Sequence, residues 1–255
     1  MLLWRTTFLA STHFNLLVSQ TGPFSTISQR SYSMELNNSR DSVTQGDELV
    51  NFYGNGTASA YADMMDEEVK KTIPDLKLLL TSLPDEGLIL DTCVGSGHML
   101  RWIHENHGSQ KTRQLQGIDI SSEMLEQART RLPGSMANLV LGNMLDVSSQ
   151  VDESCAAVMN TFALHHATAK ECKTAIQEWT RILKPGGCLY VGAWEGKGDI
   201  DYGDYSPGFK AVLHQQTDII DWMTDSGLTI VQSRTHMEEE MGMNSFYVIG
   251  KKPTK

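Results

Sequence analysis

The stretch GLILDTCVGSG, residues 87–97, decides the fold of this chain. Its apolar first half is typical of a short buried strand over 87–91, and its glycine-rich second half is typical of a turn. From about His98 onward the sequence predicts a helix. Glycine is needed in such a turn because the backbone has to approach a ligand closely and adopt positive φ angles. This order of strand, turn and helix indicates an α/β domain that binds a ligand at the turn.

Apolar runs alternate with helical patterns along the rest of the chain. Further strands are predicted at residues 114–120, 138–141, 156–162, 188–194, 228–234 and 246–250. Helices are predicted at about 122–132, where Ser121 or Ser122 can be the cap, at 169–183 and at 217–223. The second helix follows a capping box of Thr168 and Glu171, and KPGG at 184–187 ends it. The alternation predicts a doubly wound, mostly parallel, seven-stranded Rossmann-like sheet with helices on both faces.

Three other segments have predicted positions relative to this sheet. Residues 47–80 have a helical pattern and precede the first strand, so they are expected to pack over the sheet's open edge or its ligand crevice. The polar stretch 196–210 is predicted to be a loop near the carboxyl end of the fifth strand, where ligands bind in open α/β sheets. The charge run 238–240, three glutamates, is predicted to lie in a solvated turn.

The N-terminal segment has a composition of its own. Residues 1–34 contain Arg5 and Arg30 but no Asp or Glu, and they are rich in Ser and Thr. This pattern is typical of a mitochondrial transit peptide; a plastid peptide, a secretory signal or a plain tail are the alternatives. The predicted organisation is a targeting presequence at 1–33, a helical cap at 34–86 and a ligand-binding domain at 87–255.

Composition limits the class of protein. The 255 residues carry a formal net charge of −10, which argues against a nucleic-acid partner. No apolar stretch approaches the roughly eighteen residues of a membrane-spanning helix, so no integral membrane segment is expected. The four cysteines have no C-x-x-C pair and are predicted to be buried, reduced thiols: Cys93, Cys155, Cys172 and Cys188.

Polar residues after the second and third strands point to a nucleoside ligand. Asp119 lies twenty-two residues after Gly97, at a strand end, where a carboxylate can accept both ribose hydroxyls. Asn143 and Met144 follow the third strand, where an amide and a backbone N–H can bind an adenine edge. A dinucleotide is the rival ligand, but its fingerprint requires a third glycine, and Gly97 is followed by HML.

Five motifs in this order carry a resemblance: LDTCVGSG, GIDISSEML, LGNMLD, NTFALHH and ILKPGGCLYV. Over residues 47–250 the chain resembles class I S-adenosylmethionine-dependent methyltransferases, and most of all the C-methyltransferases of ubiquinone and menaquinone biosynthesis. The resemblance implies S-adenosylmethionine (SAM) as cofactor, with Asp91, Gly95 and Gly97 around its methionine part, Asp119 on the ribose, and Asn143 and Met144 on the adenine. Cys93 and Ile120 complete the implied cofactor set. Cys93 stands where the family usually has Gly, and Asn143 where it more often has Asp.

Candidate residues for the acceptor side follow from position. His165 and His166 lie just past the fourth strand and are the candidate catalytic bases, because a histidine can deprotonate a phenol, enol or thiol near neutral pH. Structural roles in helix capping or core packing are the alternative for each. Tyr61, Trp194 and His214 are candidates for the acceptor pocket. No metal site is predicted, since His104 and His107 are spaced as on a solvated helix surface, without a third ligand nearby.

The residues favour an enzyme that methylates a small molecule, and the resemblance suggests a quinone-like or other aromatic metabolite. The alternative is a methyltransferase-fold mitochondrial assembly factor that binds SAM and acts through protein partners. A third reading is methylation of one protein side chain. No feature of the sequence indicates whether the chain is a monomer or an oligomer.

Overall fold

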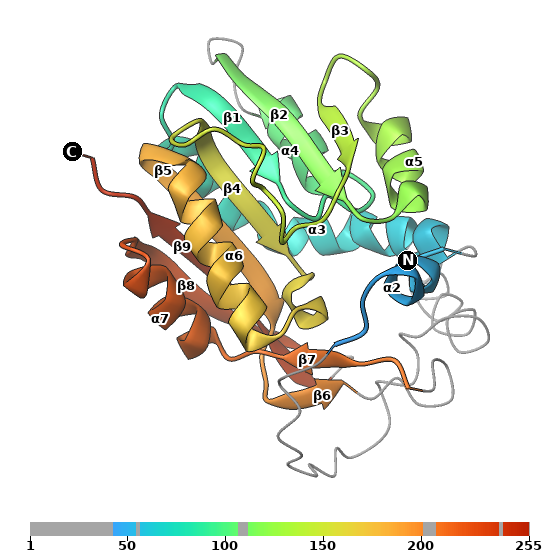
Figure 1. Cartoon of the computed structure of the whole chain (residues 1–255). Coiled ribbons are helices and arrows are strands. Elements are labelled where there is room, and N and C mark those ends of the chain that lie inside the picture. The colour runs from blue at the N-terminus through green and yellow to red at the C-terminus, as the bar shows by residue number, and fades with distance from the viewer. Residues whose placement is uncertain (1–42, 55–56, 107–111, 201–207, 240–241, 255) are drawn as a thin grey trace, which may run out of the picture.

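A seven-stranded sheet forms the centre of the computed structural model, which describes residues 43–54, 57–106, 112–200, 208–239 and 242–254 (Figure 1). The strand order is β3-β2-β1-β4-β5-β9-β8, and β9 runs antiparallel to both of its neighbours. The strands are β1 (Glu86–Asp91), β2 (Thr112–Asp119), β3 (Asn138–Leu141), β4 (Cys155–Thr161), β5 (Leu183–Trp194), β8 (Thr229–Glu238) and β9 (Met243–Lys251). The predicted seven-stranded, mostly parallel sheet is confirmed.

Helices cover both faces of this sheet (Figure 1). On one face α3 (Thr57–Ser82), α4 (His98–Asn106) and α5 (Ser122–Arg131) share an apolar core with the sheet, and on the other face α6 (Ala169–Ile182) and α7 (Gln216–Asp225) do so. Short elements complete the described chain: α2 (Asp47–Phe52), the 3-10 turn η2 (Leu164–His166) and a hairpin of β6 (Gly198–Ile200) with β7 (Ala211–Leu213).

Strand β4 shows why the central strands are apolar along their whole length. Val158 is fully buried on the α6 face, and Met159 is fully buried on the α3 face. Successive side chains of a strand point to opposite faces, so a strand between two helical layers needs apolar residues at every position. The helix starts are confirmed as well: Ser121 caps α5, and Thr168 and Glu171 form the capping box of α6.

Three predicted boundaries were wrong. Strand β5 begins at Leu183, so KPGG at 184–187 belongs to the strand, at an irregularity in its pairing with β4. Strand β8 extends to Glu238, which is buried, accepts hydrogen bonds from Lys71 and Ser245, and does not lie in a solvated turn. Part of the predicted loop 196–210 forms β6, because residues 198–200 pair with β7.

The N-terminal presequence lies outside the described residues. Among the helices that the structure describes, none is both long and apolar enough to cross a membrane.

A buried carboxylate ties helix α3 to the far edge of the sheet. Asp75, on α3, is fully buried and accepts hydrogen bonds from Arg234 and Gln232 of β8. The Tyr190 hydroxyl of β5 donates to it as well, at 3.4 Å. The Arg234 guanidinium also lies 4.0 Å from the ring centre of Tyr247. Asp75 thus fixes α3 across strands β5, β9 and β8.

Replacing Asp75 with Ala is expected to lower the free energy of unfolding by about 3–5 kcal/mol, because it leaves a partly buried guanidinium without its partner. Urea denaturation followed by circular dichroism would measure the loss. Asp225→Ala is the matched control: Asp225 forms an exposed ion pair with Lys173, and such pairs contribute at most about 1 kcal/mol. Equal losses in the two variants would contradict the assigned role of Asp75.

Candidate functional site

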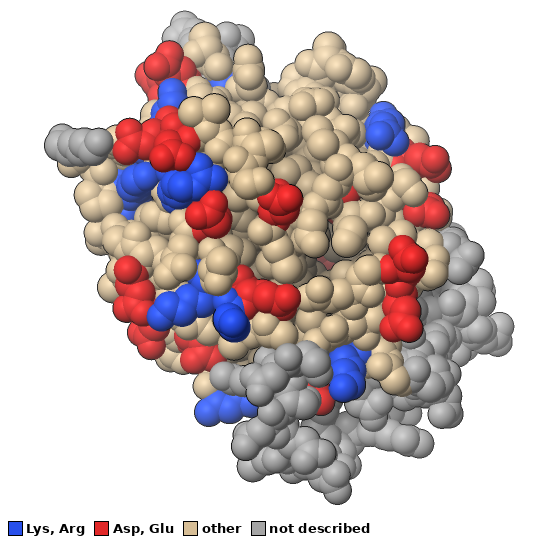
Figure 2. All heavy atoms as spheres, viewed as in Figure 1, with Lys and Arg blue, Asp and Glu red and all other residues tan. Residues whose placement is uncertain are grey.

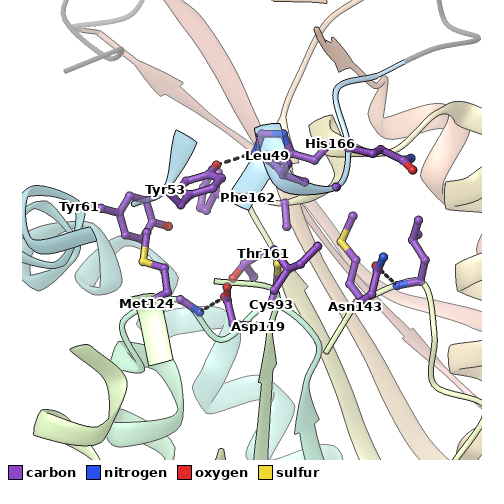
Figure 3. Close-up of a pocket in the computed structure, with 17 residues that line it drawn as sticks. Leu49, Tyr53, Tyr61, Cys93, Asp119, Met124, Asn143, Thr161, Phe162 and His166 are labelled. Atoms are coloured by element: carbon purple, nitrogen blue, oxygen red, sulfur yellow. Dashed lines mark hydrogen bonds between the residues drawn. The ribbon is translucent and has the colours of Figure 1, made fainter. Parts of the chain in front are cut away.

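A cavity of about 320 Å³ lies at the carboxyl ends of β1, β2, β3 and β4, with α2 and the first turns of α3 as its other walls (Figure 3). Ligand pockets of α/β sheets lie at this edge, because the loops that leave parallel strands converge there. The lining residues are Gln45, Gly46, Leu49, Tyr53, Tyr61, Cys93, Gly95, Asp119, Ile120, Met124, Asn143, Met144, Leu145, Thr161, Phe162, Ala163 and His166.

The glycine-rich turn after β1 is shaped by two carboxylates. The Gly95 amide donates to Asp119 Oδ2 at 2.8 Å, and the Cys93 amide donates to Asp91 Oδ1 at 3.1 Å. Gly95 adopts φ +49°, a conformation that favours glycine, and it exposes backbone to the cavity. Gly97 does not line the cavity; a Cβ there would lie 3.2 Å from Ala128 of α5 and 3.0 Å from Leu132 Cδ1, so the glycine allows the turn to pack on α5.

Burial makes both carboxylates unusually weak acids. It raises the pKa of Asp119 to about 6, although the amides of Ser121 and Gly95 donate to this carboxylate and act in the opposite direction. It raises the pKa of Asp91 to about 7, and the neighbouring Asp119 adds to that shift. Of the two, Asp119 lines the cavity, and Asp91 lies behind the turn. A hydroxyl-bearing ligand that donates to Asp119 would stabilise its ionised form.

A hydrogen-bonded chain of Ser96, His98 and Asp66 lies behind the same turn. His98 Nδ1 is 2.9 Å from Ser96 Oγ, and its Nε2 is 2.7 Å from Asp66 Oδ1 on α3. Ser96 is only 2% exposed and does not line the cavity, so these three residues do not present a nucleophile. They instead attach the glycine-rich turn to α3.

The opposite end of the cavity is formed by α2 and by the chain just after β4 (Figure 3). The Tyr53 hydroxyl lies 2.6 Å from His166 Nε2, and the two rings meet edge to face. Leu49, on the same short helix as Phe52, lies beside them. Phe162 has φ +53°, which is rare for a large side chain; strain of this kind gathers at functional sites. Its amide donates to Gly192 O at 2.7 Å, which holds this conformation.

Eight of the residues singled out from the sequence line the cavity: Tyr61, Cys93, Gly95, Asp119, Ile120, Asn143, Met144 and His166. Five do not: Asp91, Gly97, His165, Trp194 and His214. The other three cysteines are buried in the core, and Cys93 is half-buried at the cavity wall. None of the four cysteines is paired in a disulfide.

The residues that lie outside the cavity wall pack behind it. The His165 ring lies between those of His166, at 3.9 Å between centres, and Trp194, at 4.9 Å. His214 is buried on the other side of η2, with Nε2 3.0 Å from the carbonyl oxygens of Leu164 and Ala167. His214 therefore contacts the backbone of η2 and does not line the cavity.

Tyr53, Leu49 and Gln45 line the cavity although the sequence did not single them out. They belong to the segment before the sheet, which was expected to pack over the edge or the crevice, and only its position in space shows that it closes the crevice. A signal was present in the aromatic pair at 52–53, since aromatic residues on a short polar helix need an apolar partner.

The charge of the lining matches a positively charged ligand. Asp119 is the one carboxylate among the lining residues that the structure describes, and none of them is Lys or Arg. Among the described residues no group of three or more His, Cys, Asp or Glu side chains could hold a metal ion. On the face seen in Figure 2, Lys and Arg side chains are interspersed with Asp and Glu, and they do not form a continuous basic surface there.

Comparisons with known proteins agree with this geometry. Residues 89–187 match the family model described as a methyltransferase domain. The chain is 29% identical over 119 residues to a dTDP-3-amino-3,4,6-trideoxy-alpha-D-glucopyranose N,N-dimethyltransferase of Streptomyces venezuelae, covering 46% of each protein. It is 33% identical over 105 residues to the demethylmenaquinone methyltransferase of Chlamydia caviae, covering 40% of this chain and 42% of that protein. The chain thus spans about half the length of the curated relatives it matches.

Among solved structures, geranyl diphosphate C-methyltransferase of Streptomyces coelicolor superimposes with a TM-score of 0.60 at 12% identity, over 82% of this chain and 89% of that one. At this identity the similarity concerns the fold alone. The strand order and the ligand cavity at the carboxyl edge agree with the match of residues 89–187 to a methyltransferase domain.

Proposed function

We propose that this chain transfers the methyl group of SAM to a small-molecule acceptor. The observation that carries the proposal is the Asp119 carboxylate, which is held by the Gly95 and Ser121 amides at the wall of the cavity. When bound, SAM would supply an activated methyl group: as the acceptor atom bonds to the methyl carbon, the carbon–sulfur bond would break, and its electron pair would stay on sulfur as a neutral thioether.

The residues around the cavity fit this cofactor. The exposed backbone at Gly95 allows a ligand to approach a turn that a Cβ would narrow, since that Cβ would lie 3.5 Å from the Tyr61 ring. Asp119 can accept both ribose hydroxyls. Asn143 and Met144 lie at the end of the cavity formed by β3, where they can contact the adenine. Tyr61 offers an aromatic ring to the sulfonium charge.

The protein's contribution to the transfer is alignment and exclusion of water. Leu49, Phe162 and Ala163 provide apolar walls at the acceptor end. His166 is the proposed partner for an acceptor that gives up a proton, because it lines this end, whereas His165 is packed behind it. Burial lowers the pKa of His166 to about 3, so its ring is uncharged at neutral pH, and its Nε2 is hydrogen-bonded to the Tyr53 hydroxyl.

An aromatic, quinone-like acceptor is the favoured class within this proposal. The partial identity to a demethylmenaquinone methyltransferase supports it, as does the aromatic lining of Tyr53 and Phe162. The basic, acid-free segment 1–34 supports delivery to the mitochondrion. The alternative is an assembly factor that binds SAM and acts through protein partners.

A labelling experiment separates these functions. The chain from Met34 onward is incubated with methyl-labelled SAM and a fractionated mitochondrial extract. Label in the solvent-extractable small molecules, absent with Asp119→Ala, would support the proposal. Label in protein would instead support methylation of a protein side chain. Cofactor binding without any transfer would support the assembly factor.

Asp119→Ala is expected to weaken binding of S-adenosylhomocysteine (SAH) at least about tenfold, because two hydrogen bonds to a charged group are lost. Isothermal titration calorimetry measures the dissociation constant. Asp146→Ala is the control, since Asp146 is an exposed carboxylate after β3 that does not line the cavity. An unchanged constant in Asp119→Ala would refute the assignment of the ribose site.

Binding of SAH is also expected to weaken as the pH falls. The pKa of Asp119 is raised to about 6, so the carboxylate is ionised at pH 7.5 and mostly protonated at pH 5, where it can no longer accept two hydroxyls. One coupled proton gives up to about a tenfold rise in the dissociation constant between pH 7.5 and 5. Calorimetry across this range, repeated with Asp119→Asn, tests it. A variant that keeps the full pH dependence would assign the effect to another group, with Asp91 the nearest.

A further inference from the structure

The acceptor end of the cavity carries a hydrogen-bonded pair that the cofactor does not require. Tyr53 and His166 come from segments 113 residues apart, and their side chains meet at 2.6 Å in the cavity wall (Figure 3). Asp119 lies at the other end (Figure 3), where its carboxylate accepts a hydrogen bond from the Gly95 amide of the glycine-rich turn. The pair is therefore placed to contact the second substrate.

His166 retains an unused polar atom. The residue is 6% exposed, its Nε2 is occupied by Tyr53, and its Nδ1 is buried with no hydrogen-bond partner among the described residues. A buried polar nitrogen without a partner costs about 1–3 kcal/mol, and only a ligand that reaches Nδ1 itself would recover this cost. The Tyr53 hydroxyl, which both donates and accepts, can extend the hydrogen-bonded chain to a ligand oxygen.

The same end of the cavity has nothing to neutralise an anion. Leu49, Phe162 and Ala163 are apolar, and no Lys or Arg is among the described lining residues. The histidines do not compensate, because burial lowers the pKa of both His165 and His166 and keeps them uncharged. A phosphate or carboxylate bound here would remain unpaired in a partly buried site that already contains Asp119, and an unpaired buried charge is costly.

We propose that the acceptor is an uncharged molecule whose hydroxyl, phenolic or enolic, hydrogen-bonds to the Tyr53–His166 pair. This inference rests on the proposed methyl transfer and specifies its second substrate. Tyr53 contacts the acceptor hydroxyl, and His166 orients Tyr53. An acceptor that is recognised by a phosphate, diphosphate or carboxylate group does not fit this cavity.

The test measures binding of acceptor analogues to the full-length chain saturated with SAH. The probes are 2-naphthol, a neutral phenol, and 6-hydroxy-2-naphthoate, which has the same hydroxyl and an added carboxylate. Calorimetry gives their dissociation constants for the wild type, for Tyr53→Phe and for the control Asn51→Ala, whose exposed side chain lies on the same helix but outside the cavity lining. SAH affinity of each variant, measured first, confirms that the cofactor end is intact.

The wild type is expected to bind 2-naphthol at least about tenfold more tightly than the naphthoate, which corresponds to about 1.4 kcal/mol. Tyr53→Phe should weaken binding of 2-naphthol about three- to tenfold, the contribution of one hydrogen bond, with SAH affinity unchanged. Asn51→Ala should bind both probes like the wild type.

Three outcomes would overturn the inference: equal or tighter binding of the naphthoate, unchanged binding of 2-naphthol by Tyr53→Phe, or no binding of the neutral phenol at all. Each of these leaves the proposed methyl transfer standing, provided that SAH binds. Failure of the wild type to bind SAH would instead refute the proposed function itself, which separates the two conclusions.

Discussion

The hydrogen bond from the Gly95 amide to the Asp119 carboxylate is the contact on which the site depends. It joins the turn after β1 to the end of β2 at 2.8 Å, and so fixes two neighbouring strand ends relative to each other. The other carboxylate oxygen accepts from the Ser121 amide, and Ser121 in turn caps α5. One buried acid thus sets the glycine-rich turn, the start of a helix and the polar wall of the cavity. Its raised pKa shows that burial opposes the charge and that backbone amides only partly compensate for this.

Most of the fold could be predicted from the sequence because its signals are local. An apolar run such as CAAVMNT, residues 155–161, reports a strand buried on both faces, and the capping box of Thr168 and Glu171 reports a helix start. The wrong predictions concern strand boundaries that depend on a partner distant in the sequence. KPGG contains a proline and two glycines, which usually end an element, yet here it continues β5 through an irregular pairing. Glu238 belongs to a charge run, but it is buried because it accepts hydrogen bonds from Lys71 of α3 and Ser245 of β9.

The cofactor end of the site was predictable, and the acceptor end was predictable only in part. Asp119, Asn143 and Met144 line the cavity as expected, because their positions follow from their distance to strand ends, which a motif records. Trp194 and His165 are adjacent to the wall but face one another, since side-chain direction at a strand end depends on twist and packing. Tyr53 carries no local mark of function, because its importance arises only when α2 is placed against η2.

Distant parts of the chain form the cavity wall, and this has a consequence for how the ligand preference of the cavity can change. Asp119, Gly95 and the residues after β3 come from the 89–187 segment that matches the methyltransferase family, whereas Leu49 of α2 and Tyr53, which caps that helix, lie upstream of it. Under the proposed function, the segment around α2 is therefore a place where substitutions would alter acceptor choice without touching Gly95 or Asp119. Exchanging this segment between related chains would change one wall of the cavity and leave the sheet as it is.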